Sequence, residues 1–179
     1  HRSYNEKNWR ILPRQAVHDS SSVTYPVFTA IAAPEVQNKL NGDFAIIAGP
    51  YLQNLATGGC ELDYTLTFVS EKFISMVFFG VLDEGEKEIF AKIPLNIDVQ
   101  TGAQLALGDV LNLRDADLLP VLRLLTKKDM VDFSKGIPES WYYNGTNFVF
   151  CQRSETGEWL EATVAASDLK KFLLKPELF

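Results

Sequence analysis

Hydrophobic and polar side chains follow a two-residue period through the middle of the chain. Residues 62–68 alternate apolar and polar side chains, residues 73–82 are almost continuously apolar, and residues 89–99 alternate again. These patterns predict a half-buried strand, a strand covered on both faces and a third strand. The connecting segments, residues 70–72 and 83–86, are too short for the crossover that parallel strands require. The pattern therefore predicts an antiparallel meander.

A helical period precedes this meander. From Pro34 onward, apolar side chains recur on one face of a helix, a pattern typical of an amphipathic helix packed on a core. The positions on that face are Val36, Leu40, Phe44, Ile47, Ala48, Tyr51, Leu52 and Leu55. Proline suits the first turn of a helix, so Pro34 fits the start. Gly49-Pro50 is expected to kink or break the helix, because proline lacks a backbone donor and clashes with the preceding turn.

The second half of the chain predicts another long helix followed by short strands. The helix is expected over residues 118–130, with Asp115 or Asp117 as its N-cap. Asn144-Gly145 lies between two β-rich runs and predicts a tight hairpin, since both residues tolerate a positive φ angle. The remaining expected elements are a last strand over residues 159–164 and a final helix over residues 168–173.

These elements predict an α+β fold in which an antiparallel β-sheet meander packs against two to three helices. Residues 1–22 are polar and form an N-terminal arm that can add an edge strand. The arm residues expected to dock on the core are Trp9, Ile11 and Leu12. Residues 23–179 are expected to form a single α+β unit, with a first half over residues 23–80 and a second half over residues 81–179.

Composition narrows the class of protein. The chain has 179 residues, of which 46% are hydrophobic and 22% charged, as in an ordinary globular protein. The net charge of -6 argues against a nucleic-acid partner and is compatible with a basic partner, although it also fits simple solubility. No apolar run is long enough to cross a membrane. The chain begins at His1 rather than at methionine, so an upstream segment is expected in the full-length protein.

The sequence offers no constellation of catalytic or metal-binding residues. Its two histidines, His1 and His18, lie in the polar arm without the carboxylate spacing of a zinc site. No phosphate-binding loop or nucleophile motif is present, so neither a cofactor nor an enzyme activity is predicted. Cys60 and Cys151 allow two interpretations: a pair of buried free thiols, or one disulfide in an oxidising compartment.

Two turns of the predicted sheet carry charged side chains beside aromatic residues. Loops on a rigid sheet are the usual location of binding residues, so these turns are the predicted partner-binding surface. Its residues are Glu84, Glu86, Arg153, Glu155, Glu158 and Trp159. The alternative interpretation is that the carboxylates are solvated loop charges and that Trp159 belongs to the core.

Several segments, in order, resemble a bacterial pair of domains of unknown function. They are residues 23–28, 35–41, 63–67, 73–78, 96–111, 148–150 and 166–169. The most specific is the run from Thr101-Gly102 to Asp109, which matches the pattern T-G-x-x-L-x-L-x-D. The resemblance covers about residues 23–175. This pair of domains occurs in the ectodomain of the lysozyme-sensing anti-sigma factor RsiV and beside the catalytic domain of polysaccharide deacetylases such as PdaC.

The resemblance implies a non-catalytic, extracytoplasmic binding or sensory domain at the bacterial cell envelope. Its ligand would be a protein, such as a basic lysozyme-like enzyme, or a cell-wall glycan. The alternative is an accessory module of a secreted or anchored polysaccharide-modifying enzyme. The chain departs from the family in two loops. Residues 80–88 lack the family's histidine, and residues 152–157 lack the proline and tyrosine near the lysozyme-contacting loop, so lysozyme binding is not carried over.

Overall fold

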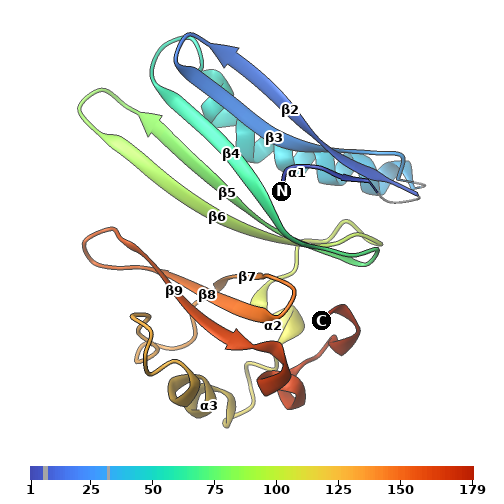
Figure 1. Ribbon diagram of the computed structural model, residues 1–179, viewed down its shortest axis with the longest axis vertical. Helices are drawn as coiled ribbons and strands as arrows, with labels where there is room; N and C mark the ends of the chain where they lie inside the picture. Colours follow the sequence, from blue (N-terminus) through green and yellow to red (C-terminus); the bar gives the residue numbers. More distant parts are fainter. Residues whose placement is uncertain (6–7, 32) are drawn as a thin grey trace.

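The computed structural model describes residues 1–5, 8–31 and 33–179 and shows two β-sheets with helices (Figure 1). Residues 6–7 of the predicted arm, and residue 32, lie outside the described residues. The larger sheet consists of β1 (Tyr4–Asn5), β2 (Arg10–His18), β3 (Ser21–Thr29), β4 (Cys60–Val69), β5 (Phe73–Asp83) and β6 (Glu88–Asp98), in that order. The smaller sheet consists of β7 (Ser140–Tyr143), β8 (Asn147–Arg153) and β9 (Trp159–Ala165). The helices are α1 (Pro34–Gln53), α2 (Leu107–Val110), α3 (Leu118–Leu125) and the 3-10 helices η1 (Ala166–Phe172) and η2 (Pro176–Leu178).

The predicted α+β class is confirmed, and strands β4, β5 and β6 form the predicted antiparallel meander. Strand β3 pairs with β4 in parallel, over residues 22–23 and 61–62. The sequence pattern did not indicate this pairing. Helix α1 connects these two strands, and a connection of that length can return the chain in the same direction. Residues 10–18 of the arm form β2, which pairs with β3 along its full length. Ile11 of this strand and Trp9 just before it are buried, whereas Leu12 is exposed.

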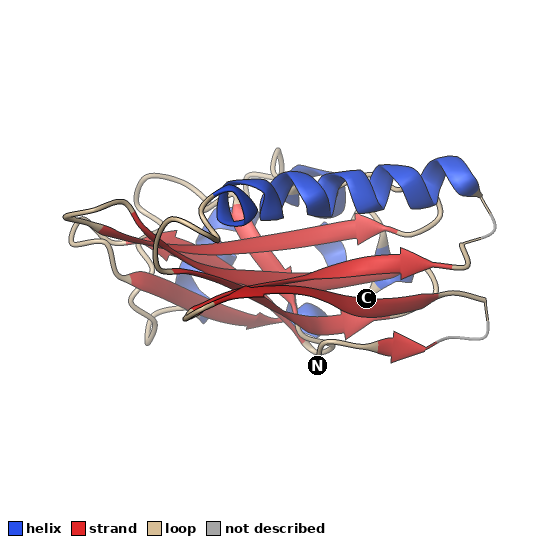
Figure 2. Ribbon diagram, turned by 90° about the horizontal axis from the view of Figure 1, so that it is seen from above, coloured by secondary structure: helices blue, strands red, loops and turns tan. Residues whose placement is uncertain are grey.

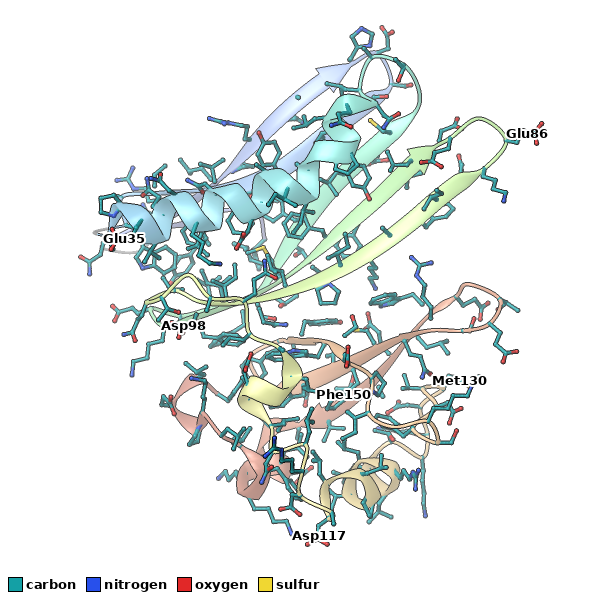
Figure 3. All side chains as sticks on the ribbon, turned by 180° about the vertical axis from the view of Figure 1, so that it is seen from behind. Glu35, Glu86, Asp98, Asp117, Met130 and Phe150 are labelled. Atoms are coloured by element: carbon teal, nitrogen blue, oxygen red, sulfur yellow. The ribbon has the colours of Figure 1, made fainter. Side chains whose placement is uncertain are left out.

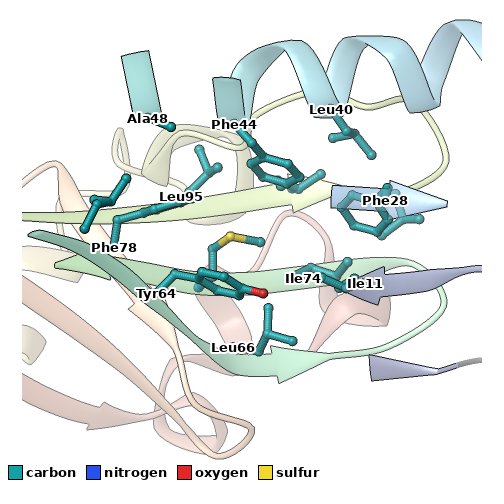
Figure 4. Close-up of a cluster of buried hydrophobic side chains, with 14 of the residues drawn as sticks. Ile11, Phe28, Leu40, Phe44, Ala48, Tyr64, Leu66, Ile74, Phe78 and Leu95 are labelled. Atoms are coloured by element: carbon teal, nitrogen blue, oxygen red, sulfur yellow. The ribbon is translucent and has the colours of Figure 1, made fainter. Parts of the chain in front are cut away.

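Helix α1 lies along one face of the larger sheet (Figure 2). The predicted face supplies the contact, because Val36, Leu40, Phe44, Ala48 and Tyr51 are all buried. Figure 4 shows Phe44 and Leu40 pointing from the helix toward Phe78, Ile74 and Tyr64 on the sheet. This cluster forms the core between α1 and the larger sheet. The helix does not cover the opposite face of that sheet.

Two helix predictions were wrong at their boundaries. Pro50 does not break α1, which continues to Gln53. The proline forgoes one backbone hydrogen bond, from position 50 to the Ile46 carbonyl, but packing of the buried Tyr51 holds this last turn in the helix. The second long helix ends at Leu125 instead of reaching Met130, whose side chain is 78% exposed. The segment that follows therefore belongs to a loop near the β8–β9 hairpin (Figure 3).

A buried network of hydrogen bonds joins the two sheets. The Ser75 hydroxyl donates to Oδ1 of Asn96 at 2.6 Å, and Nδ2 of Asn96 donates to the Trp141 carbonyl at 2.8 Å. The backbone N–H of Tyr143 donates to the Ser75 hydroxyl at 2.9 Å. Residues 75 and 96 lie on β5 and β6, whereas Trp141 and Tyr143 lie on β7. The network thus supplies partners for backbone groups of β7 that would otherwise be buried without any.

The two cysteines are buried and free, which agrees with the first of the two interpretations. Cys60 lies at the start of β4, whereas Cys151 lies on β8 of the other sheet. Burial raises the pKa of the Cys151 thiol to about 12, and the nearby Glu161 carboxylate acts in the same direction. Cys151 is therefore a protonated thiol at neutral pH, a poor nucleophile and a structural side chain.

Candidate functional site

The floor of the candidate site is the sheet face opposite α1, at the end that the smaller sheet leaves uncovered. The pattern predicted that β5 is covered on both faces, but Phe79 is 40% exposed. On β6, Phe90 is 59% exposed. The register places Phe79 opposite Lys92 and Val81 opposite Phe90, so these side chains share one face. The result is a half-exposed aromatic surface on an otherwise well-packed sheet.

The β8–β9 hairpin forms the facing wall. In Figure 1 its tip and the tip of the β5–β6 hairpin project toward the same side of the molecule. Together the two hairpins and β4 line an open pocket of about 440 Å³. Its lining residues are Glu61, Asp63, Phe79, Gly80, Val81, Phe90, Ala91, Lys92, Arg153, Gly157 and Trp159. We call this space the hairpin cleft.

Glu161 of β9 organises the inner end of the hairpin cleft. Its Oε1 accepts hydrogen bonds from Nζ of Lys92 at 2.9 Å and from the indole N–H of Trp159 at 3.0 Å. Its Oε2 accepts from the Tyr142 hydroxyl at 2.8 Å. The Lys92 ammonium also lies 5.5 Å from the ring centroids of both Phe79 and Trp159. The carboxylate therefore fixes a lysine between two aromatic rings, where cation–π attraction adds to the ion pair.

These contacts set the protonation of Glu161. Burial acts to raise the pKa of this carboxyl, but hydrogen bonds from Lys92, Tyr142 and Trp159 outweigh burial and hold the pKa below its usual value. Burial raises the pKa of Tyr142, and its bond to the Glu161 carboxylate raises it further. At neutral pH the cluster thus consists of a carboxylate, an ammonium and a neutral phenol. It is a structural support for the cleft wall.

The lowered pKa of Glu161 predicts a pH-dependent contribution to stability. A carboxyl group whose pKa is lower in the folded state stabilises the fold above its unfolded pKa, and this contribution is lost as pH falls through the folded pKa. At about pH 7 we expect the wild type to resist urea better than Glu161→Gln, and the difference to close as the pH falls below 4.5, the ordinary pKa of a glutamate side chain. The matched control is exposed Glu177→Gln, which should leave the midpoint unchanged. A constant difference for Glu161→Gln across this range would contradict the assignment.

The structure brings two of the six predicted partner-binding residues into the cleft. Arg153 and Trp159 line it, and the Arg153 guanidinium donates hydrogen bonds to the carbonyls of Phe90 and Gly157. Trp159 is half-buried and lies at the wall, with the indole N–H engaged. Arg153 thus links the rims of the two hairpins.

The four predicted glutamates lie outside the pocket, on the exposed tips that flank it. Glu84 and Glu86 occupy the β5–β6 turn, and Figure 3 shows Glu86 at its outer end. Glu155 and Glu158 are exposed in the turn between β8 and β9. The two loops, predicted separately from the sequence, therefore form opposite rims of one cleft.

The sequence interpretation missed the floor residues Phe79, Phe90 and Lys92, and the support residue Glu161. The signal for the floor was available in the hairpin register. A turn at residues 84–87 places Phe79 opposite Lys92, and Phe90 beside them on the same face. No sequence pattern could have paired Lys92 with Glu161, because the two residues belong to different sheets.

Two properties of the described residues limit the chemistry of the site. Within residues 1–5, 8–31 and 33–179, no three histidine, cysteine, aspartate or glutamate side chains gather as metal ligands would. Over the same residues, no helix combines the length and apolar character needed to span a membrane. The cleft presents an aromatic surface and charged rims to a ligand.

Comparison with known proteins places the fold. No family model and no curated protein matches the sequence. A solved structure of a DUF3298 family member from Bacteroides fragilis matches with a TM-score of 0.66 at 11% identity, covering 94% of this chain and 93% of that one. A DUF3298 family protein from Pseudomonas aeruginosa matches with a TM-score of 0.59 at 12% identity, covering 96% and 95%. The chain thus shares the fold of these domains of unknown function.

Proposed function

We propose that this chain, which has the fold of DUF3298 family proteins, is a non-catalytic binding domain that takes a basic protein partner in the hairpin cleft. The observation that carries the proposal is an exposed aromatic floor between two acidic hairpin tips. We place the domain outside the cytoplasm, at the bacterial cell envelope, on the sequence resemblance described above. The fold alone does not define an activity, so the proposal rests on the cleft and not on the fold.

Charge supports a basic partner. The β5–β6 tip carries Asp83, Glu84, Glu86 and Glu88 against one lysine, Lys87. Two further carboxylates flank the cleft from the β8–β9 turn. Acidic rims attract a basic protein over distance and disfavour acidic ones. Exposed aromatic rings at the centre can then receive aliphatic side chains, or a lysine or arginine over a ring face.

A cell-wall glycan is the second candidate, and it would suit an accessory module of a polysaccharide-modifying enzyme. Trp159 supports it, because a half-buried indole beside Asp63 and Arg153 resembles a stacking surface with polar groups at its edge. The acidic rims give a neutral sugar no advantage, whereas they favour a basic protein directly. We therefore place the protein partner first.

Neutralising the rims tests the proposal. Lysozyme is a suitable probe because it is a strongly basic protein, and it serves here only as a representative of that class. Isothermal titration at low salt should detect binding, and the rim variant should bind about tenfold more weakly, since each close charge pair contributes up to about 1 kcal/mol. The rim variant combines Glu84→Gln, Glu86→Gln, Glu155→Gln and Glu158→Gln.

The control variant removes the same charge at exposed positions elsewhere. It combines Glu35→Gln, Glu71→Gln, Asp168→Asn and Glu177→Gln. Binding by the control variant should stay within about twofold of the wild type, because screened charges distant from the contact contribute little. Equal weakening in both variants would show a non-specific charge effect. Binding of chitin oligosaccharides, unaffected by the rim variant, would favour the glycan instead.

A further inference from the structure

Strand β6 exposes one backbone edge to the hairpin cleft. The N–H of Glu84 donates to the Lys87 carbonyl at 2.9 Å, which fixes these two residues as a hydrogen-bonded pair of the β5–β6 hairpin. Hydrogen-bonded and non-hydrogen-bonded pairs alternate along an antiparallel ladder. Residues 89, 91 and 93 therefore bond to β5, whereas the backbone groups of Glu88, Phe90 and Lys92 point away from it.

The same edge already accepts an extended segment farther along the strand. The N–H of Asp98 donates to the Ala103 carbonyl at 2.9 Å, and the N–H of Leu105 donates to the Asn96 carbonyl at 2.8 Å. Ile97 and Gln104 form an isolated antiparallel bridge between these contacts. The chain after β6 thus pairs with the outward edge at residues 96–98. The geometry of this edge is suited to strand addition.

The edge is open at residues 88–92. Among the residues that the structure describes, no backbone group pairs with the outward N–H of Phe90 or Lys92, and Phe90 receives only the Arg153 side chain at its carbonyl. Exposed edge strands are usually protected by charged side chains. Here Ile89 and Phe90 are 43% and 59% exposed, and the Lys92 ammonium is held against Glu161.

We propose that the hairpin cleft receives its basic partner by strand addition, with an extended partner segment pairing along residues 88–92 of β6. This inference rests on the proposed function and names the mode of recognition at the same site. Main-chain hydrogen bonds give such a complex affinity, and alternate side chains give it selectivity. One set of partner side chains lies over Phe79, Phe90 and Trp159 and is apolar. The segment also carries lysine or arginine that meets Glu88 and the rim carboxylates.

A matched pair of variants at Phe90 isolates the backbone contact. Phe90→Ala removes the ring but keeps the outward N–H, whereas Phe90→Pro removes both. Proline should be tolerated, because its missing donor makes no bond to β5 and Pro94 already occupies an outward position four residues along the same strand. The probe is a synthetic peptide of alternating lysine and valine. Phe90→Pro should bind it about five- to tenfold more weakly than Phe90→Ala, the effect of one lost hydrogen bond.

A second measurement needs no variant of the protein. Peptides methylated at backbone nitrogens along one edge cannot donate from that edge. Two peptides are compared, each methylated along a different one of its two backbone edges. One of them should lose binding to the wild-type protein, while the other keeps it. Hydrogen exchange at the amides of Phe90 and Lys92 should slow on binding of the unmethylated peptide.

The outcomes separate this inference from the proposed function. Rim-dependent binding with equal affinities for Phe90→Pro and Phe90→Ala, and unprotected amides, would overturn strand addition and leave the proposed function standing. Binding of neither lysozyme nor the peptide would overturn both. Weaker binding by Phe90→Pro, with loss for one methylated peptide alone, supports strand addition.

Discussion

Asn96→Leu is expected to lower the free energy of unfolding by about 2–4 kcal/mol, because the buried Ser75 hydroxyl loses its acceptor and the buried Trp141 carbonyl loses its donor. Asn96 is 4% exposed and bonds both the Ser75 hydroxyl and the Trp141 carbonyl. Leucine has a similar volume, so little of the loss would come from a cavity. Urea unfolding followed by circular dichroism measures the change.

The matched control is Asn38→Leu on the exposed side of α1. Its effect should stay within about 0.5 kcal/mol, as for most surface substitutions. If Asn96→Leu and Asn38→Leu had equal effects, the network between the sheets would contribute no stability. Ser75→Ala should also destabilise, because it leaves the buried N–H of Tyr143 without its acceptor.

Gly80→Ala is expected to cost about 2–3 kcal/mol through overpacking. A Cβ atom at this position would lie 1.9 Å from the Tyr51 hydroxyl oxygen and 2.3 Å from its ring carbon Cζ. Tyr51 is 5% exposed, so the ring has no free space into which to move. Glycine on this central strand thus makes room for the last turn of α1. Thermal or urea unfolding measures the loss.

Two control variants identify the cause of the stability loss in Gly80→Ala. Gly42→Ala, on the exposed side of α1 with no atom within 4 Å, should stabilise the fold by about 0.5–1 kcal/mol. In a Tyr51→Ala background, Gly80→Ala should cost less than about 0.5 kcal/mol, because the clashing ring is gone. An undiminished cost in that background would show that the backbone at Gly80, and not Tyr51, is responsible.

Local periodicity predicted the elements that bury one face and expose the other. The meander followed from alternation in residues 62–68 and 89–99, and the buried face of α1 from its helical period. The hairpin turn at Asn144-Gly145 was predicted correctly, although only Gly145, at φ +96°, has the positive φ angle that both residues tolerate. In each case, the information lies within a few neighbouring residues.

Features that depend on distant residues were not predictable in the same way. Pro50 stays helical because tertiary packing of Tyr51 outweighs a local preference. The apolar run of α3 ends at Leu125, although the periodic pattern continues, since Met130 finds no core to cover it. The contact between the two sheets includes Asn96 and Ser75, two polar residues whose hydrogen-bonding roles appear only when β7 lies beside them.

The candidate site was likewise predictable only where neighbouring residues determine it. Its rims were predicted because charged turns are visible in the sequence, and Arg153 and Trp159 were among them. Its floor was missed because Phe79 and Phe90 resemble core residues of apolar strands. They are exposed only because the smaller sheet covers one end of the larger sheet and leaves the other open.

The most direct test of a binding role for the hairpin cleft is an NMR titration of the isotope-labelled domain with lysozyme. We expect the largest shifts at the amides of Phe79, Phe90 and Arg153 and at the indole N–H of Trp159, which line the pocket. The exposed surface of α1, on the opposite face of the sheet, should be unaffected. Shifts confined to α1, or none at saturating lysozyme, would contradict the assignment of this cleft as the site for a basic protein.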